Sequence, residues 1–345
     1  MRRFPLLAIL LAIAAAVEPP RDWGDARDEW AGSGDYEASK AICRKLRDRE
    51  PPASDRPDSA TARSLEGCDS EALYYGIGMP RDPVRARQCA FLEAEADDGG
   101  VFSGRTMLMT IYANGQGARR DLDVATHLAC GIDGAPMESH GRVTHLAELK
   151  RTGWKGQDFH FCDDITSGLA MGYCASHEAG KAGALREAAL AAMTRPWTAA
   201  DKRAFERLRQ AHSAYVEAHG SGEVDMTGTA RAALSIQAEE ALRDELVEML
   251  ERLRSGRALP TPAARLPAED AALNAAYRKR LQEAGGEDAG PGAVTADGIR
   301  AAERAWLRYR DSFLDFASVK FPRVPRNELA AWLTRKRTAV LMGEE

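Results

Sequence analysis

The spacing of apolar residues predicts an all-α protein. Along almost the whole chain they recur every three or four positions, which is typical of helices that bury one face. Alternating runs of β-branched residues, which would predict strands, are nearly absent. Turn-forming Pro and Gly interrupt the helical pattern in three places, at residues 50–60, 255–267 and 283–298. The chain therefore divides into groups of helices joined by loops.

One loop pattern occurs twice in the N-terminal half, as YYGIGMPRDPVRA (74–86) and as YANGQGARRDLDVA (112–125), at a constant offset of 39 residues. A period of this length indicates stacked helical hairpins. In each copy the first Gly would end one helix in the left-handed conformation, the second would tighten the turn, and the Asp would cap the next helix. The repeat-loop residues are Gly76, Gly78, Asp82, Gly115, Gly117 and Asp121.

This loop spacing resembles the Sel-like repeats, relatives of tetratricopeptide repeats that form α/α solenoids and act as adaptors. The resemblance covers about residues 60–150. Residues 139–153 look like the first helix of a third copy without its partner, and residues 34–46 like the second helix of a degenerate earlier copy. Because a stable stack usually needs three or more repeats, we expect the array to lean on the domain that follows.

The C-terminal half shows one pattern of three helices twice. The predicted helices cover residues 183–193, 202–219 and 236–253, and then 271–281, 299–313 and 328–341. The predicted architecture is therefore a helical repeat domain at 21–155 followed by two small helical domains at 160–254 and 266–345.

The helix predicted at 299–313 carries one apolar stripe, formed by Ile299, Ala302, Trp306, Tyr309, Phe313 and Phe316. Spacings of three and four favour packing in a core over exposure for binding. Arg304, Arg308 and Asp311 lie off the stripe, and the last two can pair along the helix. These charges favour a solvated face, but a recognition surface stays open as an alternative.

The same helices resemble the LprI-type lysozyme inhibitors, a family of exported bacterial proteins. That family shows an L-N-x-x-Y helix, a variable loop, and a Q/E-R-x-W-x-x-Y/F-R-D helix. The match is close over about 40 residues and comprises Leu273, Asn274, Tyr277, Glu303, Arg304, Trp306, Tyr309, Arg310 and Asp311. The family often has a Cys shortly after R-D, where this chain has Ser312. Residues 205–233 resemble a looser copy, with Tyr215 at the Trp position. The resemblance implies an exported helical domain that blocks muramidases.

Residues 1–16 predict a cleavable signal peptide, with a basic start, a short apolar core and three Ala at its end. The predicted product is periplasmic, without a membrane anchor. Six Cys in an exported chain indicate disulfides rather than metal ligands. A Cys162–Cys174 bridge is favoured. Cys68–Cys89 is a second candidate, in competition with Cys43–Cys68 combined with Cys89–Cys130.

Charge and motifs narrow the function classes. The chain has a net charge of −5, or −7 without the two signal-peptide arginines, which disfavours nucleic acid and suits a basic protein such as lysozyme. No hydrolase, zinc-protease or P-loop motif occurs, so we expect neither an enzyme nor a cofactor. We expect no metal site either, because these candidate ligands match no known ligand spacing: His140, His145, His160, Cys162 and Asp163. Two hypotheses remain, an inhibitor of lysozyme-type muramidases and a solenoid adaptor that binds another exported protein or peptide.

Overall fold

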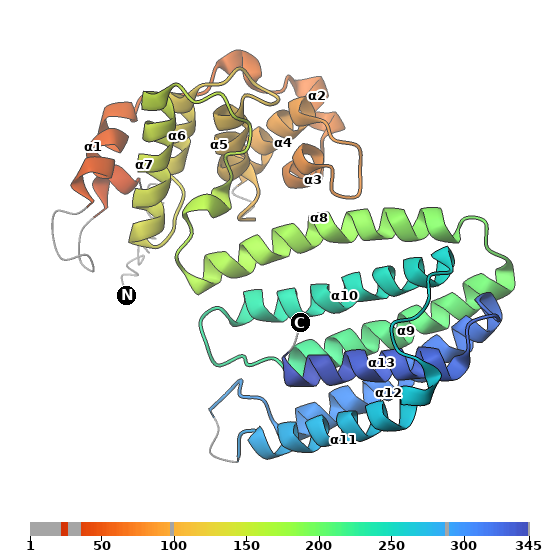
Figure 1. Ribbon diagram of the computed structural model, residues 1–345. Helices are drawn as coiled ribbons and strands as arrows, with labels where there is room; N and C mark the ends of the chain where they lie inside the picture. Colours follow the sequence, from red (N-terminus) through yellow and green to blue (C-terminus); the bar gives the residue numbers. More distant parts are fainter. Residues whose placement is uncertain (1–21, 27–35, 97–99, 287–289, 344–345) are drawn as a thin grey trace, which may run out of the picture.

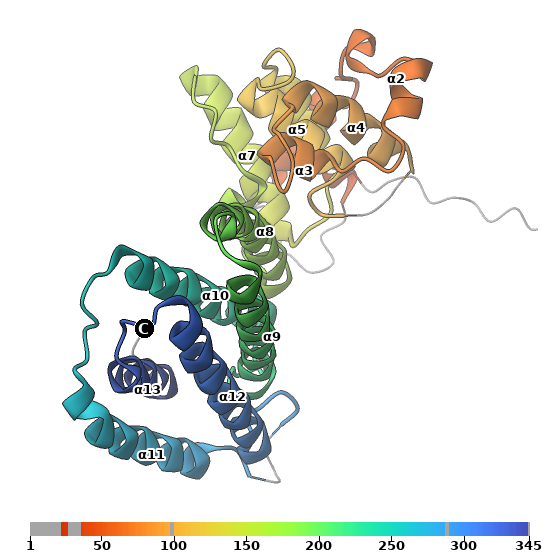
Figure 2. The same ribbon diagram turned by 90° about the vertical axis from the view of Figure 1, so that its right-hand side faces the viewer.

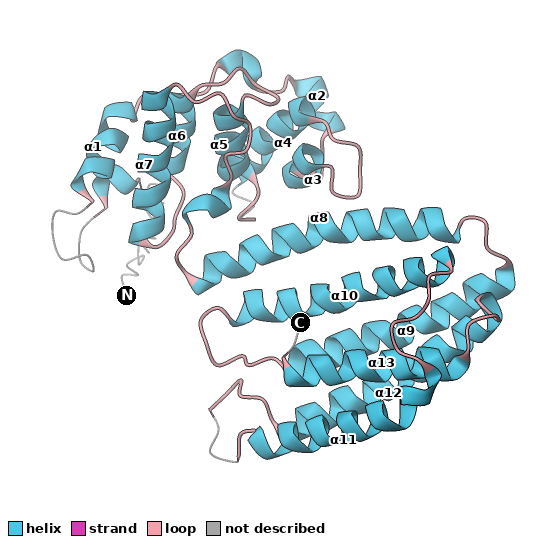
Figure 3. Ribbon diagram, viewed as in Figure 1, coloured by secondary structure: helices cyan, strands magenta, loops and turns pink. Residues whose placement is uncertain are grey.

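A computed structural model describes residues 22–26, 36–96, 100–286 and 290–343, and all its regular elements in these ranges are helices (Figures 1 and 3). The all-α prediction is confirmed. The predicted signal peptide at 1–16 lies outside the described residues. None of the described helices is long and apolar enough to cross a membrane. The α-helices are α1 (Glu37–Leu46), α2 (Ser59–Ser64), α3 (Ser70–Tyr75), α4 (Pro83–Ala96), α5 (Gly104–Asn114), α6 (Leu122–Cys130), α7 (Pro136–Thr152), α8 (Gly168–Thr194), α9 (Ala199–Gly222), α10 (Arg231–Ser255), α11 (Leu266–Glu283), α12 (Ala296–Lys320) and α13 (Arg326–Met342). Short 3-10 turns are η1 (Trp23–Asp25), η2 (Ala53–Asp55), η3 (Phe161–Asp164) and η4 (Ala263–Arg265).

The two repeat loops fold alike. Gly76 ends α3 and Gly115 ends α5, both in the left-handed conformation, at φ 78° and 65°. The Asp82 N–H donates to Leu73 O (2.8 Å), and the residues 39 positions later repeat this bond, from Asp121 N–H to Tyr112 O (3.1 Å). The sequence repeat therefore corresponds to two equivalent helical hairpins, α3–α4 and α5–α6.

Close packing between the hairpins requires a Gly in the second loop. A Cβ atom on Gly117 would lie 2.1 Å from the carbonyl oxygen of Pro83, at the start of α4. Asp121 also caps α6, because its side chain accepts hydrogen bonds from the N–H groups of Asp123 and Val124.

The position of α1 differs from the prediction. As the second helix of an earlier repeat copy, α1 should pack beside α3. It packs instead against α6 and α7, at the opposite end of the stack (Figure 1). There α1 covers α7, which the sequence predicts as the first helix of a third repeat copy that lacks its second helix. The Cys43–Cys130 disulfide fixes α1 to α6. The N-terminal helix thus completes the last hairpin.

All six Cys form disulfides, which fits an oxidising compartment. The structure forms the two candidate bridges, Cys162–Cys174 and Cys68–Cys89, and adds Cys43–Cys130. The competing scheme that paired Cys43 with Cys68 is therefore wrong. A Cys43–Cys68 bridge would require α1 to lie next to the first hairpin, whereas α1 lies at the far end of the stack.

The helix α8 connects the two halves of the molecule. It begins at Gly168, well before the predicted start at residue 183, and its 27 residues run between the N-terminal helices and α10 (Figures 1 and 2). Gly168 and Gly172 allow α8 to approach the start of α10, because Cβ atoms there would lie 2.1 Å from Thr229 O and 3.0 Å from Ala232 Cβ.

The C-terminal helices share one core. Figure 2 shows α9, α10, α11 and α12 arranged around α13, most of which is buried. Among the described helices, α9 and α12 form the most extensive pair, which joins the second helices of the two predicted domains. Their buried apolar residues form a single cluster that extends from Leu190 to Leu341.

Candidate functional site on the C-terminal helices

The apolar stripe of α12 is buried, as its spacing predicts. Trp306 is only 2% exposed and Phe313 is fully buried. The stripe packs on α9, where the rings of Tyr309 and Tyr215 stack with centroids 5.6 Å apart. Trp306 is therefore a core residue, and any contact with a partner must come from the other faces of α12.

A buried charge cluster holds the two groups of three helices together. Arg337 of α13 donates two hydrogen bonds to Glu223, just after α9 (2.7 and 2.8 Å), and one to Glu303 of α12 (3.0 Å). Its guanidinium also donates to the Tyr215 hydroxyl (3.2 Å), and His219 lies 2.8 Å from Glu223. Both Arg337 and Glu223 are almost fully buried, so each depends on the other for its charge.

The two carboxyl groups of this cluster have pKa values shifted in opposite directions. Burial tends to raise the pKa of Glu223, but the hydrogen bonds from His219 and Arg337 outweigh burial and lower it. Burial raises the pKa of Glu303, because one bond to Arg337 does not offset it and Glu223 adds repulsion. Glu223 is thus the main counter-ion of Arg337.

The face of α12 opposite the stripe carries two arginines that have no partner among the described residues. Asp297 pairs with Arg300 (2.8 Å), and Asp315 pairs with Arg326 (3.2 Å). Between these pairs lie Arg304 and Arg308, both exposed. Over the described ranges of the chain, neither makes an ion pair or a side-chain hydrogen bond.

An exposed apolar side chain lies between these two arginines. Leu307, 37% exposed, lies between Arg304 and Arg308 along the helix. Like charges four residues apart destabilise a helix by about 0.2–0.5 kcal/mol, so folding gains nothing from this pair. We call Arg304, Leu307 and Arg308 the α12 outer face.

The other residues of the LprI-like motif pack in the core or bond to neighbouring residues of the chain. Leu273 is buried, Tyr277 is half-buried against the core, and the exposed Asn274 side chain donates to Asp270 O (2.8 Å). The expected Arg308–Asp311 pair does not form. Asp311 instead accepts a bond from Arg310 (3.2 Å), whose guanidinium carbon lies 5.3 Å from the centroid of the Trp306 ring.

The comparison with protein families agrees with this placement. Residues 263–341 match the family model described as lysozyme inhibitor LprI. We call them the LprI segment; it includes η4, α11 and α12, and α13 almost to its end. No curated protein and no solved structure matches the chain. The predicted resemblance of the C-terminal helices is confirmed, whereas the Sel-like repeats and the second LprI copy stay predictions.

Charge is distributed unevenly between the LprI segment and the rest of the chain. The segment contains fourteen Lys and Arg and ten Asp and Glu, a net charge of +4. Residues 17–262 contain thirty-one Lys and Arg and forty Asp and Glu, a net charge of −9. The acidic character of the whole chain therefore does not describe the surface of the LprI segment.

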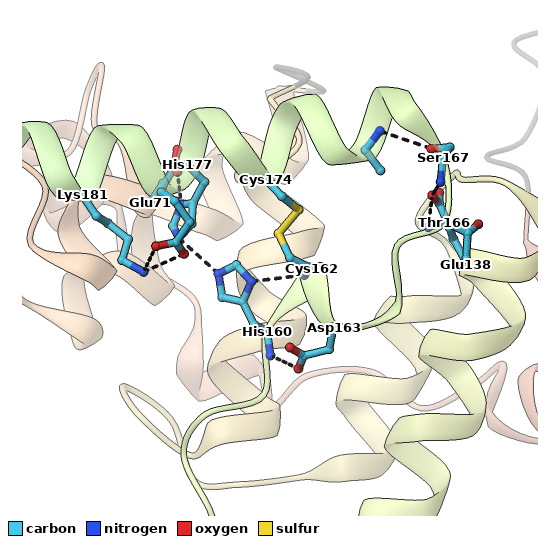
Figure 4. Close-up of a disulfide and its surroundings, with 12 residues drawn as sticks. Glu71, Glu138, His160, Cys162, Asp163, Thr166, Ser167, Cys174, His177 and Lys181 are labelled. Atoms are coloured by element: carbon cyan, nitrogen blue, oxygen red, sulfur yellow. Dashed lines mark hydrogen bonds and ion pairs between the residues drawn. A yellow bond between two sulfur atoms is a disulfide. The ribbon is translucent and has the colours of Figure 1, made fainter. Parts of the chain in front are cut away.

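The structure separates most of the metal-ligand candidates considered from sequence. His140 bonds to Ser39 (3.0 Å), and His145 pairs with Asp164 (2.9 Å). Cys162 lies in a disulfide, and Asp163 accepts a bond from the N–H of His160. His160 faces a second imidazole, that of His177 of α8 (Figure 4). Sequence reasoning missed His177, although the favoured Cys162–Cys174 bridge joins this loop to α8 three residues before it.

Proposed function

We propose that this protein is an exported inhibitor that binds a lysozyme-type muramidase through its LprI segment. The observation that carries the proposal is the family match over residues 263–341, together with the α12 outer face on the motif helix of that segment. The family is described as an inhibitor family, so we propose no catalytic activity. The disulfides suit the periplasm, where such an inhibitor would meet a muramidase.

The chemistry of the α12 outer face fits the active site of a glycosidase. Most glycoside hydrolases cleave with a pair of Asp or Glu residues in a cleft, so even a basic lysozyme has an acidic site. Arg is enriched at interface hot spots and forms bidentate bonds with carboxylates. Arg304 and Arg308 have no ion-pair partner in the part of the chain that the structure describes, and Leu307 adds apolar area. We therefore propose that local charge, rather than the net charge of the chain, guides binding.

A titration of purified, oxidised protein into a basic lysozyme tests this function, with lysis of a cell-wall suspension as the readout. We expect saturable inhibition with one protein chain per enzyme. Arg304→Glu combined with Arg308→Glu should weaken inhibition at least tenfold, because it reverses the charge of the contact. Failure of the folded wild-type protein to inhibit would refute the proposal.

A matched variant controls for the change in net charge. Arg278→Glu with Arg335→Glu alters the charge by the same amount at two exposed positions, on α11 and α13. We expect this variant to inhibit like the wild type within about threefold. Equal losses in the two double variants would mean that only total charge matters, and would remove the α12 outer face from the proposal.

The alternative is a solenoid adaptor, and one observation favours it. A pocket of about 500 Å³ lies beside the first repeat loop, lined by Leu65, Leu73, Met79 and Arg81 among others. Its size and mixed lining suit a short peptide segment. If the folded wild-type protein fails to inhibit, this alternative becomes the better hypothesis.

A further inference from the structure

Two imidazole rings face each other where the loop after α7 meets α8. The Nε2 atoms of His160 and His177 lie 3.1 Å apart, next to the Cys162–Cys174 disulfide (Figure 4). The His177 side chain is fully buried, and His160 is partly buried. Neither ring takes part in the α12 outer face or in the buried charge cluster.

The orientation of His177 is fixed from three sides. Its Nδ1 lies 2.5 Å from a carboxylate oxygen of Glu71, on α3. Phe102 stacks on the ring at 4.3 Å between centroids, and Tyr75 meets it edge-on at 4.5 Å. Because Glu71 accepts the Nδ1 hydrogen, the lone pair of His177 lies on Nε2, toward His160. A carboxylate on the second nitrogen of a His is the usual support of a metal-binding His.

A third potential ligand lies beside the rings. The carboxylate of Glu178, the residue after His177, has one oxygen 3.8 Å from His177 Nε2, and its side chain is 61% exposed. The ligand atoms of His160, His177 and Glu178 all lie within 4.8 Å of one another. The exposed Glu178 leaves a path for an ion to enter from solvent.

The distances fit a small transition-metal ion. Zinc–nitrogen bonds of about 2.05 Å at a tetrahedral angle place two nitrogens about 3.3 Å apart. The observed separation of 3.1 Å is close to this value. Glu178 needs only a small rotation of an exposed side chain to come within bonding distance.

We propose that His160, His177 and Glu178 bind one divalent transition-metal ion of the zinc class, with a water molecule as the fourth ligand. Two imidazoles and a carboxylate form a borderline ligand set, which suits Zn²⁺ better than Ca²⁺ or Mg²⁺. Glu71 would orient His177 from α3, so the ion would tie α8 to the N-terminal helices.

Two contacts compete with the ion and limit its affinity. The N–H of Cys162 donates to His160 Nδ1 (3.1 Å), which places the ring hydrogen of His160 on Nε2, in a bond to His177. Ion binding moves this hydrogen to Nδ1 and gives up the bond from Cys162. Lys181 also donates to both carboxylate oxygens of Glu178 (2.8 and 3.0 Å). Burial and the neighbouring His177 lower the pKa of His160 to about 4, so at neutral pH the ring is uncharged and carries only this one hydrogen.

The test is a calorimetric titration of Zn²⁺ into the tag-free, oxidised full chain at pH 7.5. We expect one ion per chain, bound in the micromolar range. Glu178→Gln and His160→Gln should each weaken binding at least tenfold, and Lys181→Met should strengthen it severalfold by freeing the carboxylate. His140→Gln, a change on α7 outside the site, is the matched control and should bind Zn²⁺ like the wild type.

Two results would overturn the proposal. One is no stoichiometric Zn²⁺ binding by the wild-type protein. The other is unchanged binding in Glu178→Gln, which alters an exposed side chain and should leave the fold intact. A thermal melt of each variant in chelator checks folding before titration. No muramidase enters this experiment, so its result is independent of the proposed inhibition.

Discussion

At the scale of single residues, burial determines the charge of His212. The ring is 6% exposed between α9 and α10, and its Nε2 lies 3.0 Å from the carbonyl oxygen of Leu242. Burial above all, with smaller contributions from Arg243, Arg186 and Arg209, lowers the pKa of His212 to about 4, although the bond to Leu242 opposes this shift. His212 is therefore neutral at pH 7 and donates its Nε2 hydrogen to that carbonyl.

This shift predicts a pH dependence of stability. In the unfolded chain His212 titrates near its usual pKa of about 6.5, so the unfolded state binds a proton before the folded state does. The neutral His212 therefore adds its full contribution to the free energy of unfolding above about pH 6.5, and this contribution is lost as the pH falls toward 4. We measure how far the free energy of unfolding falls between pH 7 and pH 5, by denaturant unfolding. This fall should be about 2 kcal/mol smaller in His212→Gln than in the wild type. Gln keeps a hydrogen-bond donor for Leu242 O. The pH dependence that comes from His160 is present in both proteins and cancels in the comparison. An identical pH dependence in both would contradict the assignment.

The sequence predicts single residues well where helical periodicity decides their position. The α12 stripe is buried because six apolar side chains at alternating spacings cannot all face water. The pairing of Asp311 was not predictable, since Arg308 and Arg310 both lie within reach and only the packing of Arg310 on Trp306 decides between them. His177 was missed because Glu71, which orients its ring, lies 106 residues away in the sequence, and because the helical pattern alone does not show that α8 turns this residue toward His160.

At the scale of elements, Arg337 determines how α13 is held against α9 and α12. Replacement of Arg337 by Met should destabilise the protein by about 3–5 kcal/mol, because Glu223 keeps a buried charge that has lost its main partner. The double change Arg337→Met with Glu223→Gln should recover part of this loss, since the unpaired charge is then removed. Denaturant unfolding at pH 7 measures both values.

The neighbouring Arg335 provides the control for this substitution. It is exposed on the same helix, so Arg335→Met should change the free energy of unfolding by less than about 0.5 kcal/mol. Equal effects of Arg335→Met and Arg337→Met would mean that the buried cluster does not hold α13.

The sequence predicts which segments are helices better than it predicts their neighbours. Each of the six helices predicted in the C-terminal half lies within α8 to α13. The start of α8 was missed because Gly168 and Gly172 normally weaken a helix, whereas here they allow close contact with α10. The position of α1 was wrong, since the repeat pattern gives the order of hairpins but not which end of the stack the N-terminus covers.

At the scale of the whole molecule, the two predicted C-terminal domains depend on each other. The α12 stripe is covered by α9, and Arg337 takes its main counter-ion from the end of α9. Helix periodicity shows that each of these helices has an apolar face but not which faces meet, because the contacts join residues about 100 positions apart. The division at residues 254–266 therefore stays a prediction, although the shared core argues against two independent folding units.

Two fragments test this dependence. Without α9 and α10, residues 263–345 would expose Trp306, Tyr309 and Phe313, and each large apolar side chain contributes about 1.5–3 kcal/mol when buried. A domain is usually stable by only about 5–15 kcal/mol. We therefore expect no cooperative thermal transition, followed by circular dichroism, for fragment 263–345, and a cooperative one for fragment 160–345, which retains the Cys162–Cys174 bridge.

Size-exclusion chromatography of the shorter fragment distinguishes the remaining outcomes. A folded dimer would mean that a second copy covers the α12 stripe in place of α9, which supports the dependence. A folded monomer of 263–345 would contradict it and support the two-domain division. In that case the LprI segment could be titrated against lysozyme alone, and the upstream helices would have a role other than completing its core.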